Sequence, residues 1–220
     1  MPRLSFALGR VLRAVATQML APATCAACGG PRGEPPPFCL TCGFPPPAPP
    51  CSFDGVPLLA AGTYAPPLAP AIRRFKFEDH PELAPDLARL LAPRLRGSGI
   101  GSGVSFVPVP LHRARLVERG YNQAALLASA LARSAGGAFL PRALERRHAT
   151  SQQARLGRRE RVANVEEAFV ARVQGAARRV ILVDDVVTTG STALTCLTTL
   201  RQAGFEALAV IALARAEGPG

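Results

Sequence analysis

Aromatic residues, lysine and long apolar runs are scarce in this 220-residue sequence. It has no tryptophan, and aromatic residues make up only 5% of the chain, so the core must be built from alanine, leucine and valine. The same scarcity argues against a surface that stacks on the bases of single-stranded nucleic acid. No segment reaches the roughly 20 uninterrupted apolar residues that a spanning helix needs, so we expect no membrane span.

Acidic residues are also in deficit. There are 15 of them against 26 basic residues, which gives a formal net charge of +11. A basic surface attracts polyanions such as nucleotides, sugar phosphates and nucleic acid. Lys76 is the only lysine, however, and biased codon usage also produces an arginine excess. Charge alone therefore indicates DNA binding only weakly, with the arginines of 142–147, those of 155–161 and the pair Arg73-Arg74 as candidate contacts.

A clean secretory signal is missing from the first 23 residues. The stretch from Leu4 to Ala21 is apolar, but Arg10 and Arg13 interrupt it. Its apolar residues recur at helical spacing, which predicts an amphipathic helix over 1–23. The residues of that face are Leu4, Leu8, Leu12, Val15 and Met19. Without a signal the thiols are expected to stay reduced, so we expect a cytoplasmic protein.

Four of the six cysteines form two CxxC pairs in a segment with little capacity for a core. Nine of the 22 prolines lie between Pro31 and Pro50, which nearly excludes a helix or a central strand there. A tetrahedral Zn²⁺ would hold such a segment together, and its role would be structural because four thiolates leave no open position for water. We therefore predict a zinc-finger-like module at 24–56, with ligands Cys25, Cys28, Cys39 and Cys42.

Two other interpretations of these cysteines stay open. The pairs can be unrelated free thiols, or one of them can be a redox CxxC motif. Cys51 is an alternative metal ligand. Cys196 falls within a predicted helix, where we expect it to be buried as a small apolar residue.

From residue 57 onward, apolar runs alternate with helical patterns. This alternation is typical of βαβ units and a parallel sheet, in which ligands bind beyond the carboxyl ends of the strands. The predicted strands are 58–64, 104–109, 180–183 and 207–214, and the predicted helices are 68–75, 83–95, 122–134 and 192–203. A basic loop is predicted after the second of these strands.

The strongest signal is the stretch 180–192, VILVDDVVTTGST. Asp184 and Asp185 follow a buried strand, and four hydroxyl residues with one glycine lead into a helix. Carboxylates accept hydrogen bonds from a vicinal diol, while hydroxyls and backbone N–H groups at a helix N-terminus receive a phosphate. Gly190 permits close approach and a positive φ. Taken singly, these features indicate a solvated strand end and a helix cap. Their conjunction at a strand-to-helix turn favours a ribose-phosphate loop.

This stretch resembles the signature by which type I phosphoribosyltransferases bind 5-phosphoribosyl-1-pyrophosphate (PRPP). Two further segments narrow the match: 107–123, VPVPLHRARLVERGYNQ, and 150–164, TSQQARLGRRERVAN. Together with the preceding CxxC pairs, they resemble the ComF family, which is linked to DNA uptake in naturally competent bacteria. The resemblance covers about residues 24–216. It implies an α/β, parallel-sheet type I phosphoribosyltransferase fold over 57–220.

The resemblance also implies roles for particular residues. Asp184 and Asp185 would hold the ribose hydroxyls of PRPP, which binds with Mg²⁺. The loop that would cradle the 5′-phosphate is Thr188, Thr189, Gly190, Ser191 and Thr192. The loop that would face the pyrophosphate contains Pro108, Val109, Pro110, His112, Arg113 and Arg115. The lid that would close over PRPP contains Gln153, Arg155, Arg158 and Arg161.

One departure from the family pattern bears on the reaction. Purine-salvage enzymes of this fold usually have an Asp base where this chain has Thr188, so a purine that must be deprotonated is not expected as the acceptor. Orotate and amine-transferring relatives lack that Asp too, which leaves transfer to an unknown acceptor, with release of pyrophosphate, open. The alternative is a non-catalytic module that binds PRPP or a nucleotide and acts with DNA or with a DNA-uptake helicase.

Overall fold

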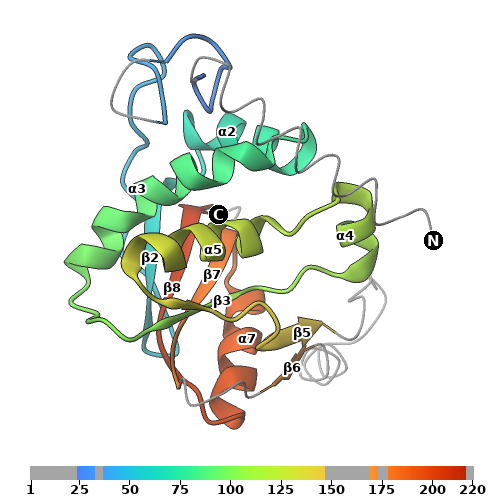
Figure 1. Ribbon diagram of the computed structural model, residues 1–220. Helices are drawn as coiled ribbons and strands as arrows, with labels where there is room; N and C mark the ends of the chain where they lie inside the picture. Colours follow the sequence, from blue (N-terminus) through green and yellow to red (C-terminus); the bar gives the residue numbers. More distant parts are fainter. Residues whose placement is uncertain (1–23, 33–36, 147–168, 173–177, 217–220) are drawn as a thin grey trace.

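The computed structural model describes residues 24–32, 37–146, 169–172 and 178–216, and a six-stranded sheet lies at its centre (Figure 1). The strand order is β1-β2-β8-β7-β3-β4, and all neighbours are parallel except β1 and β2. The strands are β1 (Ser52–Phe53), β2 (Val56–Thr63), β3 (Ser105–Pro108), β4 (Ala138–Phe139), β7 (Arg179–Val187) and β8 (Glu206–Arg215). A separate antiparallel pair joins β5 (Leu144–Arg146) to β6 (Phe169–Ala171).

Helices cover both faces of this sheet (Figure 1). One face is covered by α2 (Leu68–Phe77), α3 (Ala84–Gly97) and α5 (Gln123–Ala135), and the other by α7 (Ser191–Gln202). A single 3₁₀ turn, η1 (Pro81–Leu83), leads into α3, and the short helix α4 (Arg113–Arg119) precedes α5. The sheet is therefore a layer between two helical layers, as a parallel sheet requires.

Strand β7 contributes to the apolar core on both faces. Ile181 and Val183 belong to the cluster that α2, α3 and α5 cover, whereas Val180 and Leu182 belong to the cluster beneath α7. All four side chains are fully buried. The unbroken apolar run at this position predicted a central strand covered on both sides, and the structure confirms it.

The mixed α/β class and the mostly parallel sheet are confirmed, and each strand and helix predicted after residue 57 is present. The short strands β1, β4, β5 and β6 were not predicted, and two further elements differ from expectation. Strand β7 continues four residues beyond its predicted end, to Val187, because its pairing with β8 runs on as far as Arg215. Helix α4 forms where a basic loop was predicted. It has no buried residue, so the sequence carries no apolar periodicity that would predict it.

The proline-rich segment lies beside the last residues of β2, beyond the short edge strand β1, and bonds through its carbonyl groups. The Pro46 carbonyl accepts from the Thr63 N–H at 3.0 Å, and the Pro49 carbonyl accepts from the Arg215 side chain at 3.1 Å. Proline has no N–H to donate, so acceptor-only contacts at an edge suit it. Gly62 makes the approach possible, because a Cβ there would lie 2.5 Å from the Pro46 carbonyl oxygen.

Two sequence predictions concern the first 23 residues and membrane-spanning helices. The predicted amphipathic helix at 1–23 lies outside the described residues. Among the residues that the structure does describe, no helix has both the length and the apolar character needed to cross a membrane.

Candidate functional site

The hydroxyl-rich loop joins the end of β7 to the start of α7. Thr188 and Thr189 are exposed, and Gly190 follows with φ +79° before the helix begins at Ser191. The hydroxyls of Thr189 and Ser191 lie 2.9 Å apart, within hydrogen-bond distance. A small pocket opens here, lined by Asp184, Val186, Val187, Thr188, Thr189, Gly190, Ser191, Thr192 and Ala193. The structure thus gathers the predicted phosphate-loop residues around one pocket.

Gly190 is required at this turn for two reasons. Its positive φ is a conformation that side chains with a Cβ rarely adopt. A Cβ would also lie 2.0 Å from the ring of Phe53, which packs against the glycine from strand β1. The proline-rich segment therefore ends by placing an aromatic ring against the loop, a contact that the sequence did not predict.

In the first turn of α7, the Ser191 N–H donates to the Thr189 hydroxyl at 3.4 Å, but the N-cap residue, Gly190, supplies no side-chain cap. The first N–H groups of a helix have no partner within the helix, and the helix dipole makes that end favourable for an anion. Because the pocket lies against this turn, the geometry suits a phosphate or another compact anion.

The two acidic residues differ in their surroundings. Asp184 lines the pocket and is partly exposed, whereas Asp185 is buried and does not line it. Since β7 continues to Val187, both residues lie within the strand, and successive side chains of a strand point to opposite faces. The structure therefore brings only one of the two predicted diol-binding carboxyl groups to the pocket lining.

Burial raises the pKa of the Asp184 carboxyl to about 8, with a further rise from the neighbouring charge of Asp185. The backbone N–H of Asp185, which donates to the Asp184 carboxylate at 2.8 Å, and the positive charge of Lys76 act in the opposite direction. A carboxyl with this pKa is largely protonated at neutral pH, so it can donate as well as accept a hydrogen bond.

Lys76 is a site residue that the sequence reasoning missed. Its ammonium group, at the end of α2, lies 2.9 Å from the Asp185 carboxylate, and the two side chains are only 18% and 12% exposed. One signal in the sequence pointed to it: this is the only lysine among 26 basic residues. A lysine offers a compact point charge where an arginine would bring a planar fork.

The predicted pyrophosphate loop has a definite local structure. Pro108 ends β3, and the Val109 N–H donates to the Val183 carbonyl at 2.8 Å. His112 is the N-cap of α4, where its Nδ1 accepts from the Ala114 N–H at 3.2 Å. Pro110 lies between them, and Arg113 and Arg115 are exposed on α4 itself. This histidine ring nitrogen is thus occupied in helix capping.

The positive charge of Arg115 on α4 acts on Arg146 at the end of β5. Burial lowers the pKa of the Arg146 guanidinium, and the charge of Arg115 lowers it further, which places the two arginines within electrostatic reach. The predicted lid residues Gln153, Arg155, Arg158 and Arg161 lie outside the described residues, as do the arginines of 155–161.

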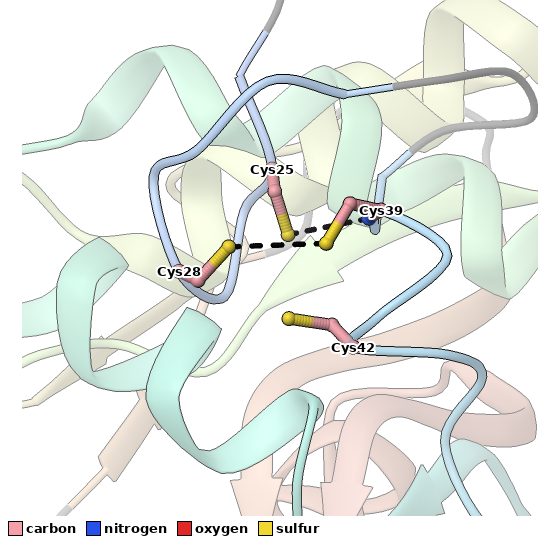
Figure 2. Close-up of side chains that lie close together, drawn as sticks. All are labelled: Cys25, Cys28, Cys39 and Cys42. Atoms are coloured by element: carbon pink, nitrogen blue, oxygen red, sulfur yellow. Dashed lines mark hydrogen bonds between the residues drawn. The ribbon is translucent and has the colours of Figure 1, made fainter.

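The four cysteines of the two CxxC pairs converge on one point (Figure 2). Their sulfur atoms all lie within 4.8 Å of one another, and the sulfurs of Cys28 and Cys39 are 3.9 Å apart. Tetrahedral zinc with Zn–S bonds of about 2.3 Å places its sulfurs about 3.8 Å apart. The cluster therefore fits a zinc module, and no cysteine in it forms a disulfide.

The thiols of this cluster differ in pKa. Burial alone would raise the pKa of Cys25, but hydrogen bonds from the backbone of Cys28, Cys39 and Ala27 outweigh burial and lower it to about 6. Burial and the three neighbouring sulfurs raise the pKa of Cys42 to about 12. Four thiolates so close together need a cation, and a dication such as Zn²⁺ would supply the missing charge.

The cysteine module is fixed to the end of α2. Arg74 donates to the Cys25 carbonyl at 2.8 Å and to the Ala26 carbonyl at 3.0 Å, and Arg32 forms an ion pair with Asp86 of α3. Because the Arg74 side chain is only 15% exposed and engaged in this way, it is not available as a DNA contact. Its neighbour Arg73 is 75% exposed and therefore stays a candidate DNA contact.

The two remaining cysteines take no part in the cluster. Cys51 does not belong to the group of four. Cys196 lies in α7 and is fully buried, as predicted. Burial raises its pKa, and the nearby Asp184 carboxyl adds to that effect, so this thiol is held in its neutral form.

Comparison with known proteins gives relatives over most of the chain, although no family model matches it. The DNA utilization protein YhgH of Escherichia coli is 36% identical over 162 residues, 72% of this chain and 71% of that protein. YhgH of Salmonella typhi is 34% identical over 195 residues, 87% of this chain and 83% of that protein. Competence protein F of Haemophilus influenzae is 37% identical over 166 residues, 72% of each. The likeness thus extends well beyond a single motif.

We expect the freshly purified, reduced protein to contain about one zinc ion per chain, bound by the four clustered thiolates. Cys39→Ser should release the metal and loosen the cysteine module, while the sheet keeps its own core. Cys51→Ser is the matched control and should retain full zinc, since Cys51 lies outside the cluster. Elemental analysis checks both, and wild-type protein without zinc would refute the metal site.

Asp184 should make the stability of the protein depend on pH. Its pKa is raised from an ordinary value of 3.8 to about 8, so the folded state binds a proton that the unfolded state has lost. Stability from this group therefore falls as pH rises from about 4 through 8. Asp184→Asn should melt a few degrees above wild type at pH 8.5, and this advantage should shrink at pH 4.5.

Thermal unfolding monitored by circular dichroism across this pH range measures the effect. Glu206→Gln is the control, because Glu206 is an exposed carboxylate at the opposite end of the sheet. Parallel pH profiles for wild type and Asp184→Asn would contradict the raised pKa.

Proposed function

This chain belongs to the ComF family, with competence protein F and the DNA utilization proteins, and from that premise we propose that it binds PRPP at the loop between β7 and α7. In this proposal, residues 57–220 form a type I phosphoribosyltransferase domain. Residues 24–56 form its zinc module. The three-layered parallel α/β architecture is consistent with such a fold.

The observation that carries the proposal is the arrangement of hydroxyls, glycine and helix N-terminus at one pocket. Thr189 and Ser191 place two hydroxyls 2.9 Å apart beside the uncapped first turn of α7. A phosphate monoester has three acceptor oxygens and a negative charge, which this combination of donors and dipole would satisfy. Asp184 lines the same pocket, within the run of residues that would meet the attached ribose.

The proposed ligand also explains the acidic and basic groups around the pocket. Mg²⁺ would bind with PRPP and neutralise part of its pyrophosphate charge. Helix α4, with Arg113 and Arg115, follows β3 along the chain, and we propose that these cations and Arg146 stabilise a pyrophosphate electrostatically. With Thr188 where a base would be needed for a purine, we propose an acceptor other than a purine, with pyrophosphate as the leaving group.

A second candidate function is a non-catalytic accessory module that binds PRPP or a nucleotide and acts with DNA or with a partner in DNA uptake. The observation that favours it is the exposed surface of α4. Leu116 and Val117 are 41% and 78% exposed there, and Arg119 of the same helix stacks on the exposed Phe77 ring at 4.8 Å. Apolar and cationic groups exposed together suit a macromolecular contact.

The first function predicts that PRPP affinity depends on the acidic pair. We expect the double variant Asp184→Asn, Asp185→Asn to lose at least tenfold in affinity for PRPP with Mg²⁺, since it removes the Asp184 carboxyl from the pocket and breaks the largely buried ion pair between Lys76 and Asp185. Titration calorimetry measures this, with Glu206→Gln as a control that should bind as wild type does. A folded double variant with unchanged affinity would sink the assignment.

The second function predicts salt-dependent binding of single-stranded DNA. Phosphate contacts by exposed arginines release counterions, so the logarithm of affinity should fall by about 0.7 per contact for each logarithmic unit of salt. Arg73→Gln and Arg142→Gln should each weaken binding and flatten that slope. Fluorescence anisotropy with and without PRPP checks this. No binding even at low salt would mean that a role in DNA handling acts through a protein partner.

A further inference from the structure

We propose that the two carboxyl groups of the acidic pair have different roles: Asp184 contacts the ligand, and Asp185 is a positioning residue that Lys76 holds against the end of α2. The inference rests on the proposed PRPP site and refines it. Adjacent carboxylates in such a loop suggest that both meet the ribose hydroxyls. The geometry of β7 points to a division between them.

The pleat of β7 separates the two side chains. Val183, one residue before the pair, packs in the cluster under α2, α3 and α5, and Leu182 packs in the cluster under α7. Alternation continues through the acidic pair and ends after it, because Val186 packs against the first cluster and Val187 belongs to the second. Asp184 lies on the α7 face, where it lines the pocket and contributes to the raised pKa of the buried Cys196 thiol. Asp185 lies on the α2 face.

On the α2 face, Asp185 is paired with Lys76. The ammonium and carboxylate groups lie 2.9 Å apart, and neither side chain is more than about one-fifth exposed, at 18% and 12%. Removing one partner of such a pair leaves a largely buried, uncompensated charge. Asp185 is therefore committed to this ion pair, and its backbone N–H in turn donates to the Asp184 carboxylate at 2.8 Å. Fixing Asp185 thus also orients Asp184.

Helix α2 is a rigid anchor for this contact. Its Phe75 is fully buried, and the Phe75 carbonyl accepts a hydrogen bond from the Tyr121 hydroxyl at 2.6 Å. Arg74, two residues before Lys76, holds the carbonyls of Cys25 and Ala26 beside the cysteine cluster. The last turn of α2 therefore joins the cysteine module, the entry to α5 and the acidic pair.

The test compares single and double variants by calorimetry with PRPP and Mg²⁺. We expect Asp184→Asn to lose tenfold or more in affinity, and Asp185→Asn and Lys76→Gln to lose about threefold each. The double variant Lys76→Gln, Asp185→Asn should lose no more than either single variant, because partners in one ion pair are not additive. Lys76→Arg should restore most of the affinity, and Arg73→Gln, an exposed cation on the same helix, is the control.

Two results would overturn this division of roles. If Asp185→Asn lowers PRPP affinity as much as Asp184→Asn does, both in wild type and in the Lys76→Gln protein, Asp185 contacts the ligand. If Lys76→Gln lowers PRPP affinity by the same factor in the Asp185→Asn protein as in wild type, Lys76 contacts the ligand itself.

A measurement on the ligand-free protein separates this inference from the PRPP assignment. The charge of Lys76 lowers the pKa of Asp184, against burial and the charge of Asp185. Lys76→Gln should therefore move the titration of Asp184 above about 8, followed through its ¹³C carboxyl resonance, while Arg73→Gln leaves it in place. No PRPP binding by wild type would refute the proposed function. An unchanged titration in folded Lys76→Gln would refute the ion pair.

Discussion

Two adjacent carboxyl groups within the last residues of a buried central strand set the main constraint on this structure. Asp185 is buried and Asp184 is only partly exposed, and removing a charge from water costs free energy unless a partner or a proton compensates it. The two faces of β7 meet this cost differently. On one face Lys76 supplies a counter-charge at 2.9 Å, and on the other Asp184 keeps its proton, with a pKa near 8, beside a pocket open to ligand. The end of α2 supplies Lys76 to the first face, and the loop before α7 forms the pocket at the second.

The cysteine module contacts the elements that surround this acidic pair. Its four clustered sulfurs fit a zinc ion, and it is not an independent appendage, because Ala26 and Phe38 belong to the core cluster that α2, α3 and α5 share. Arg74 binds its backbone, and its proline-rich continuation carries Phe53 onto Gly190 at the loop. The module therefore contacts both the helix that fixes Asp185 and the turn that would receive a phosphate. Structural zinc at this position would stabilise the ligand loop through two separate routes.

Much of this could be predicted from the sequence, and the rest could not for identifiable reasons. The buried run at 180–183 and the hydroxyl-rich turn are local patterns, so the central strand and the loop were predicted, as was the four-cysteine cluster. The end of β7 was missed because its last residues are held in the strand by pairing with β8, which the local apolar pattern of β7 does not reveal. Lys76 was missed for a similar reason. It lies more than a hundred residues from Asp185, and only the tertiary fold brings them together.

The account is tested most directly by observing the loop itself when PRPP is added. Selective ¹⁵N labelling of threonine places amide probes at Thr188, Thr189 and Thr192 in the loop, and at Thr195, Thr198 and Thr199 farther along α7 as internal references. With Mg²⁺ and PRPP, the account predicts large, saturable shifts of the three loop amides and small shifts of the references, and a strongly reduced response in Asp184→Asn. Loop amides that stay unmoved at saturating PRPP would contradict it.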